Sequence, residues 1–186
     1  GVYLVTSDAH EGIQHAISEV LPDASWQRCR THFAKNLYEK VPKTQWPMVS
    51  AMFQTIFQQP DAQSTWSQAR EVVDLIEPKF PQVATYLEES LDEVLAFTAA
   101  PKSVWSKVWS NNPTERLNRE IRRRTDVVGI FPNRESIIRL VGAVLAEQHD
   151  DWIQQKRYMS LTALEHTRHL MHRTGDANGD HNQLTA

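Results

Sequence analysis

The spacing of hydrophobic and polar positions at the start of the chain predicts a strand, a helix and a second strand. A short apolar, partly β-branched run at Val2–Val5 predicts a buried strand. From Glu11 to Leu21 the apolar residues recur at helical spacing, and Pro22 ends the pattern. A second short strand is expected around Ser25 to Cys29.

Helical periodicity then dominates residues 31–99. Four apolar-periodic segments, punctuated by prolines, are Phe33–Val41, Pro47–Phe57, Ala62–Ile76 and Val83–Phe97. Asp61 stands where an N-cap of the third segment would stand. Four aromatic residues of the region fit a helical core better than a ligand site: Trp46, Phe53, Phe57 and Trp66. We therefore expect a compact block of helices without chemistry of its own.

Two further helices and a tail are expected in the rest of the chain. One helix runs from Pro113 to about Thr125, and a turn follows at Gly129–Asn133. The next is a long helix whose apolar side chains should face a core: Ile137, Ile138, Leu140, Val141, Val144 and Leu145. Residues 174–186 are rich in Gly, Asp and Asn, which predicts a disordered tail.

Composition is typical of a soluble globular chain with one sizeable core. The 186 residues are 40% hydrophobic and 23% charged. Charged residues or prolines interrupt every apolar run before it reaches the roughly 18 residues of a membrane span, so no membrane partner is expected. The single cysteine, Cys29, cannot form an internal disulfide. With no secretory signal pattern, a reducing cytoplasm is the expected location.

Charge is distributed unevenly along the chain. The net charge is -3, but residues 1–100 hold 7 Lys and Arg against 13 Asp and Glu, whereas residues 101–186 hold 13 against 10. Five arginines of the second part fall in one short segment: Arg116, Arg119, Arg122, Arg123 and Arg124. A phosphate-binding surface is therefore expected there, although a solvated helix face with intrahelical pairs such as Glu115 with Arg119 is the simpler alternative.

Asp8 and Glu115 each allow two interpretations. Asp8 follows a predicted strand, at the edge where open α/β sheets place active groups, but its spacing to Glu11 is also that of a capping box. Glu115 heads the arginine-rich helix, yet Asn112 as N-cap with Glu115 at the third helical position describes an ordinary helix start. Spacing alone favours capping for Asp8.

Cys29 and His32 form a C-x-x-H pair whose chemistry stays open. A closed zinc site needs four ligands, and the chain has no second cysteine. A nucleophilic Cys/His pair is a poorer interpretation, because no orienting carboxylate or oxyanion hole is recognisable. A buried cysteine and a hydrogen-bonded histidine are the ordinary alternatives.

Several of these segments together resemble the Mutator-type transposases of bacterial insertion sequences. The resemblance rests on the sequence, order and spacing of Val5–Gly12, Trp26–Asn36, Trp109–Asn133, Leu145–Trp152 and Arg157–Ser160. It covers nearly the whole chain up to the tail. It includes Cys29 and His32, which match a recurring family motif of unsettled role.

The resemblance implies a predominantly helical α/β fold. It implies a ribonuclease-H-like core formed by residues 1–30 and 100–173, whose first strands precede Gly1, and a large all-helical insertion over residues 31–99. Of the family's Asp-Asp-Glu triad, the second Asp matches Asp8 and the Glu matches Glu115. The first Asp would precede Gly1, so the chain alone is expected to be inactive.

The implied function is metal-dependent cleavage and strand transfer of DNA. Asp8 and Glu115 would be ligands of Mg²⁺ or Mn²⁺. The five arginines would hold the phosphate backbone of the insertion-sequence ends and target DNA. Trp109 would stack on an unpaired base, unless it is a packing residue. A homo-oligomer on DNA, associated with the nucleoid, is implied as well.

Two rival functions remain at the level of sequence. One is a non-catalytic, truncated transposase that binds DNA or a full-length transposase and regulates it. The other is an unrelated helical interaction protein.

Overall fold

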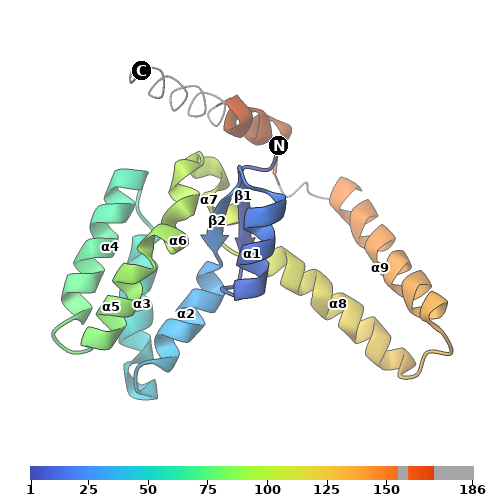
Figure 1. The fold of residues 1–186 in the computed structure, drawn as a ribbon, viewed down its shortest axis with the longest axis horizontal. Helices are drawn as coiled ribbons and strands as arrows, with labels where there is room; N and C mark the ends of the chain where they lie inside the picture. The colour runs from blue at the N-terminus through green and yellow to red at the C-terminus, as the bar shows by residue number, and fades with distance from the viewer. Residues whose placement is uncertain (155–158, 170–186) are drawn as a thin grey trace. The chain divides into compact units, whose positions relative to one another are not determined.

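We describe a computed structural model of the protein, which covers residues 1–154 and 159–169. The chain divides into two compact units (Figure 1). Unit 1 consists of Gly1–Ser110 and Leu161–Ala186, and unit 2 consists of Asn111–Ser160. The predicted tail at residues 174–186 lies outside the described residues. Among the described residues, no helix is long and apolar enough to cross a membrane.

Unit 1 begins with the predicted strand, helix and strand. Its first elements are β1 (Leu4–Ser7), α1 (Glu11–Val20) and β2 (Ser25–Arg28). The strands are parallel, and Leu4 lies opposite Ser25 in the register. The strand predicted at Val2–Val5 is displaced by two residues, because the backbones of the polar residues Thr6 and Ser7 also pair with β2.

β1 is half-buried along its length, which corrects the prediction of a buried strand. Within the described part of the chain it pairs only with β2. Its polar side chains are nevertheless bonded. The Thr6 hydroxyl donates to the carbonyl of Val108 at 2.5 Å, and the Trp26 indole N–H donates to Ser7 Oγ at 2.8 Å. A search for apolar runs misses such strand residues.

The predicted helical block is present in unit 1 (Figure 1). Its elements are α2 (Arg30–Glu39), η1 (Lys43–Gln45), α3 (Trp46–Ile56), α4 (Ala62–Ile76), α5 (Pro81–Glu89), α6 (Leu91–Leu95), η2 (Ala96–Ala99), η3 (Lys102–Val104) and α7 (Trp105–Val108). As predicted, Asp61 caps α4, and its carboxylate accepts a 2.8 Å hydrogen bond from the Ser64 amide.

The hydrophobic core of unit 1 lies in this helical block. Its largest fully buried side chains are Phe33, Phe53, Phe97, Leu37, Ile56, Ile76, Leu87 and Leu95. Trp66 is half-buried against the core, and Trp46 is 36% exposed. The tryptophan at position 46 therefore contributes less to the core than its size predicts. Residues 161–169 of unit 1 are helical.

Unit 2 is a pair of helices, α8 (Asn112–Val128) and α9 (Arg134–Gln154), joined by the predicted turn. Gly129 ends α8 with φ of +69°, a backbone conformation that favours glycine. The prediction that six apolar residues of α9 face a core is wrong for three of them. Val144 is buried, Leu140 and Val141 are half-buried, and the three exposed residues are Ile137, Ile138 and Leu145. Each helix of a two-helix pair packs against its partner along one face only, so apolar residues on its other faces stay exposed.

Candidate functional site

The two strands end at the same edge of the sheet, and several polar side chains gather there. Parallel strands bring their carboxyl ends to one side. The amide of Cys29, the first residue after β2, donates a 2.6 Å hydrogen bond to the carbonyl of Ser7, the last residue of β1. Asp8 follows Ser7 directly. The backbones of Asp8 and Cys29 therefore belong to one edge.

Asp8 does not cap a helix, which corrects the interpretation that its spacing favoured. α1 begins at Glu11, and its N-cap is His10, whose Nδ1 accepts a 3.2 Å hydrogen bond from the Gly12 amide. Asp8 is left in the loop between β1 and α1, half-buried. Its carboxylate forms no hydrogen bond or ion pair with any residue that the structure describes. The carboxylate is thus available to a ligand.

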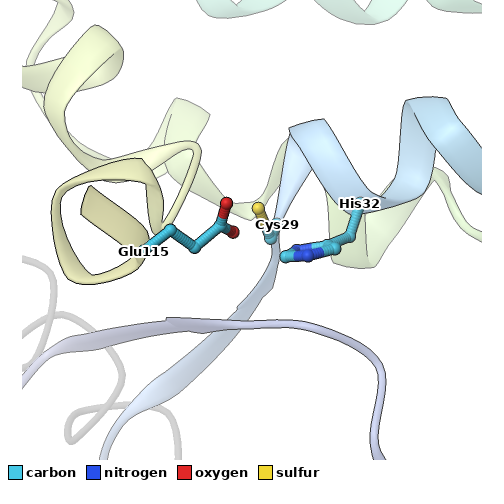
Figure 2. Close-up of side chains that lie close together, drawn as sticks. All are labelled: Cys29, His32 and Glu115. Carbon is cyan, nitrogen blue, oxygen red and sulfur yellow. The ribbon is translucent and has the colours of Figure 1, made fainter. Parts of the chain in front are cut away.

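Cys29 and His32 belong to the start of α2, directly after the end of β2. Cys29 is the N-cap residue of α2 and is fully buried, and His32 is half-buried in the first turn of that helix. Each offers one ligand atom, and the two atoms lie within 4.8 Å of each other (Figure 2). Two ligands do not complete a zinc site.

Glu115, also labelled in Figure 2, belongs to the first turn of α8 in unit 2. The helix begins at Asn112 with Asn111 as N-cap, one residue earlier than predicted. Glu115 is therefore the fourth helical residue, and its amide donates to the carbonyl of Asn111 at 3.1 Å. This position does not suit a capping box. Since Asp8 belongs to unit 1, the convergence of Asp8 with Glu115 stays a prediction.

The arginines of α8 divide into two groups. Glu120 accepts hydrogen bonds from Arg123 at 2.7 Å and from Arg124 at 2.9 Å, and Arg124 also pairs with Glu147 of α9 at 3.2 Å. The hydrogen bonds from Arg123 and Arg124 lower the pKa of Glu120 from 4.5 to about 2. The expected pair of Glu115 with Arg119 is not among the contacts described.

The second group consists of Arg116, Arg119 and Arg122, which are exposed. None of the three forms an ion pair with a carboxylate within the described ranges. They are the arginines of α8 most available to phosphate. Contact of all five arginines with DNA stays a prediction.

Trp109, the predicted base-stacking residue, packs within unit 1. Its ring is half-buried against the helical core and meets the rings of Phe57 and Phe97 edge-on, at centroid distances of 5.5 and 5.6 Å. These contacts account for a tryptophan at this position. Stacking on DNA stays a prediction that the packing does not require.

Two residues of β2 that the sequence analysis missed connect the sheet to the helical block. Gln27 is fully buried, and its side-chain amide donates to the Val94 carbonyl at 2.8 Å and accepts from the Phe97 amide at 2.7 Å. Arg28 donates to Glu93 at 3.2 Å and to the Tyr86 hydroxyl at 2.6 Å. The sequence pattern that could have indicated these contacts is the presence of polar residues inside a short predicted strand.

Comparison with known proteins defines the class. The family model described as "Transposase, Mutator family" matches residues 1–155, and the chain belongs to this family of transposases. Among its relatives is the transposase for insertion sequence element IS1081 of Mycobacterium tuberculosis. That protein is 58% identical over 168 residues, which cover 90% of this chain and 40% of the relative.

More distant relatives show the same pattern of coverage. The transposase for insertion sequence element ISRM5 of Rhizobium meliloti is 35% identical over 91% of this chain and 43% of its own length. The transposase for insertion sequence element IS256 in transposon Tn4001 of Staphylococcus aureus is 36% identical over 84% and 40%. The chain thus spans about two fifths of these relatives. Family membership excludes the unrelated helical interaction protein.

Proposed function

We propose that this chain forms part of the catalytic domain of a transposase that cleaves DNA and transfers its strands by metal-dependent phosphoryl transfer. The observation that carries the proposal is the state of Asp8. Its carboxylate stands at the carboxyl end of a parallel strand, caps no helix and has no partner among the described residues. A carboxylate without a structural role at this edge is typical of a ligand-binding group.

The chemistry of the two carboxylates supports a hard divalent cation at Asp8. Mg²⁺ and Mn²⁺ prefer oxygen ligands, which the carboxylates of Asp8 and Glu115 supply. The thiol of Cys29 and the imidazole of His32 suit softer metals, so we assign them no place in the Mg²⁺ ligand set. Two such ions, when bound, activate the attacking oxygen and stabilise the leaving oxygen.

The remaining residues would act on the substrate and on the fold. Exposed arginines of α8 would hold the phosphate backbone without recognising its sequence. Gln27 and Arg28 would hold β2, and hence the loop after it, against the helical block. A ribonuclease-H-like core composed of residues 1–30 and 100–173, the helical insertion at 31–99 and a homo-oligomer on DNA are parts of the same proposal.

The test joins this chain to the part of the Mycobacterium tuberculosis relative that it does not match, because the chain spans 40% of that relative's length. The joined protein should nick insertion-sequence ends in the presence of Mg²⁺. Asp8→Asn and Glu115→Gln should each abolish nicking. The matched controls are Asp23→Asn, at an exposed turn, and Glu135→Gln, in the first turn of α9, and both should remain active.

A regulatory, non-catalytic transposase is the second candidate. The observation that favours it is the set of exposed arginines on α8 without acidic partners in the described chain, since DNA binding through them needs no complete catalytic site. If the joined protein binds element ends and stays inert with Asp8 and Glu115 intact, the catalytic proposal fails and the regulator becomes the better account.

A further inference from the structure

Arg30 is held against two aromatic rings next to the edge where the strands end. It directly follows Cys29 in the first turn of α2, and its amide donates to the Trp109 carbonyl at 2.8 Å. The guanidinium carbon lies 4.2 Å from the centroid of the Phe57 ring and 4.7 Å from that of Trp109. The two rings are nearly perpendicular, at 86°. Arg30 therefore occupies the angle between them.

The guanidinium of Arg30 has no acidic partner within the part of the chain that the structure describes. No described carboxylate pairs with it, and no described acceptor takes a hydrogen bond from its side chain. Burial lowers the pKa of this group, against a weaker opposing effect of Tyr38. A partly desolvated cation with five N–H donors and no anion nearby is costly unless something else binds it.

Arg28, two residues earlier, shows the opposite arrangement. Its guanidinium also lies near two aromatic rings, 5.0 Å from the centroid of Phe33 and 5.4 Å from that of Tyr86. Its donors, however, are used inside the protein by Ser90, Glu93 and Tyr86. Arg28 therefore has a structural role, whereas the contacts of Arg30 fix its position and leave its donors available.

We propose that Arg30 binds a phosphate group of the DNA strand at the edge that carries Asp8. The Cys29 amide bonded to the Ser7 carbonyl fixes the start of α2 beside the end of β1, so Arg30 and Asp8 follow neighbouring positions of one edge. A planar guanidinium held on aromatic rings is suited to the non-bridging oxygens of a phosphodiester. This inference rests on the proposed function and adds a positioning residue to it.

The first test uses the NMR signal of the Arg30 side chain in the 186-residue protein. The Nε–Hε cross-peak of Arg30 is assigned by its loss in Arg30→Lys. It is then followed on titration with inorganic phosphate and, separately, with a short DNA duplex. The cross-peak of Arg30 should shift with both ligands, while that of Arg28 should stay in place. A signal of Arg30 that moves with neither ligand overturns the inference.

The second test measures the salt dependence of duplex binding. Each phosphate contact contributes about 0.9 to the slope of log affinity against log salt concentration. Arg30→Met should therefore lower the slope by about 0.9. The matched control Arg28→Met should keep the slope but lower the melting temperature, because it breaks the contacts with Glu93 and Tyr86.

The outcomes separate this inference from the proposed function. Duplex binding with an unmoved Arg30 signal and an unchanged slope in Arg30→Met overturns the inference and leaves the proposed function standing. A shift of the Arg30 signal with phosphate, in a protein that does not bind the duplex, supports the anion site and contradicts DNA binding by this chain.

Discussion

The amide of Cys29 donates a 2.6 Å hydrogen bond to the carbonyl of Ser7, so the residues after β1 and after β2 start from one edge of the sheet. The next side chain after Ser7 is the carboxylate of Asp8, and the next after Cys29 is the guanidinium of Arg30. A carboxylate suits a divalent ion, and a guanidinium suits the oxygens of a phosphate.

Asp8→Asn should leave the stability of the protein nearly unchanged, because the carboxylate caps no helix and makes no described hydrogen bond. His10→Ala is the informative comparison, because His10 caps α1 through the Gly12 amide. We expect His10→Ala to cost about 0.5–1 kcal/mol and Asp8→Asn close to none. Thermal unfolding measures both. A larger loss for Asp8→Asn would show that Asp8 has a structural role.

Gln27→Leu should destabilise unit 1 strongly. The substitution leaves the Val94 carbonyl and the Phe97 amide buried without their side-chain partner, and each such group costs about 1–3 kcal/mol. Urea denaturation should show a loss of about 2–4 kcal/mol. The control is Gln54→Leu on the exposed surface of α3, which should change stability little. Equal effects of the two substitutions would contradict the role of Gln27.

Arginines of α8 should contribute unequally to DNA binding. Arg119→Gln with Arg122→Gln removes two unpaired cations, and the slope of log affinity against log salt concentration should fall by about 1.8. Arg123→Gln with Arg124→Gln should lower it less, because both arginines are bound to Glu120. Affinity should fall similarly for all DNA sequences.

The prediction can be contradicted with a triple variant in which Arg119, Arg122 and Arg123 are all neutralised. If the triple variant keeps the salt slope of the unchanged protein, the DNA surface lies elsewhere.

Acid should weaken the ion pairs of α8 only far below neutral pH. Hydrogen bonds from Arg123 and Arg124 lower the pKa of Glu120 to about 2. Because folding lowers the pKa of Glu120, its ion pairs stabilise the folded protein fully above about pH 4.5. This stabilisation is lost as the pH falls toward 2. Carbon NMR of the Glu120 carboxyl should show a midpoint near 2, and Arg123→Gln with Arg124→Gln should raise it. A midpoint near 4.5 in the unchanged protein excludes these pairs.

Much of the fold was predictable because periodicity reports burial directly. The α4 helix has the predicted bounds, Ala62–Ile76, because its apolar face and the capping carboxylate of Asp61 both mark them. β1 was displaced in the prediction because Thr6 and Ser7 join the strand through backbone pairing, which side-chain polarity does not report. The burial of α9 was overestimated because apolar spacing does not show whether a second layer covers it.

The candidate site was less predictable than the fold. Spacing favoured Asp8 as a cap, but which residue caps α1 depends on where the loop after β1 turns, and His10 has that position. No pattern in the sequence singles out Arg30. It differs from Arg28 by its contacts with Phe57 and Trp109, which are distant from it in sequence. Trp109 was recognised, but only the packing shows that it supports Arg30.

The proposed role of Asp8 and Glu115 is best tested by the position of Mn²⁺ in crystals of the protein, located by anomalous scattering. We expect an ion ligated by carboxylate oxygens of both Asp8 and Glu115, and we expect it to be lost in Asp8→Asn and in Glu115→Gln. Carboxylates more than about 10 Å apart, beyond what two metal ions spaced by about 4 Å can bridge, would contradict the catalytic assignment.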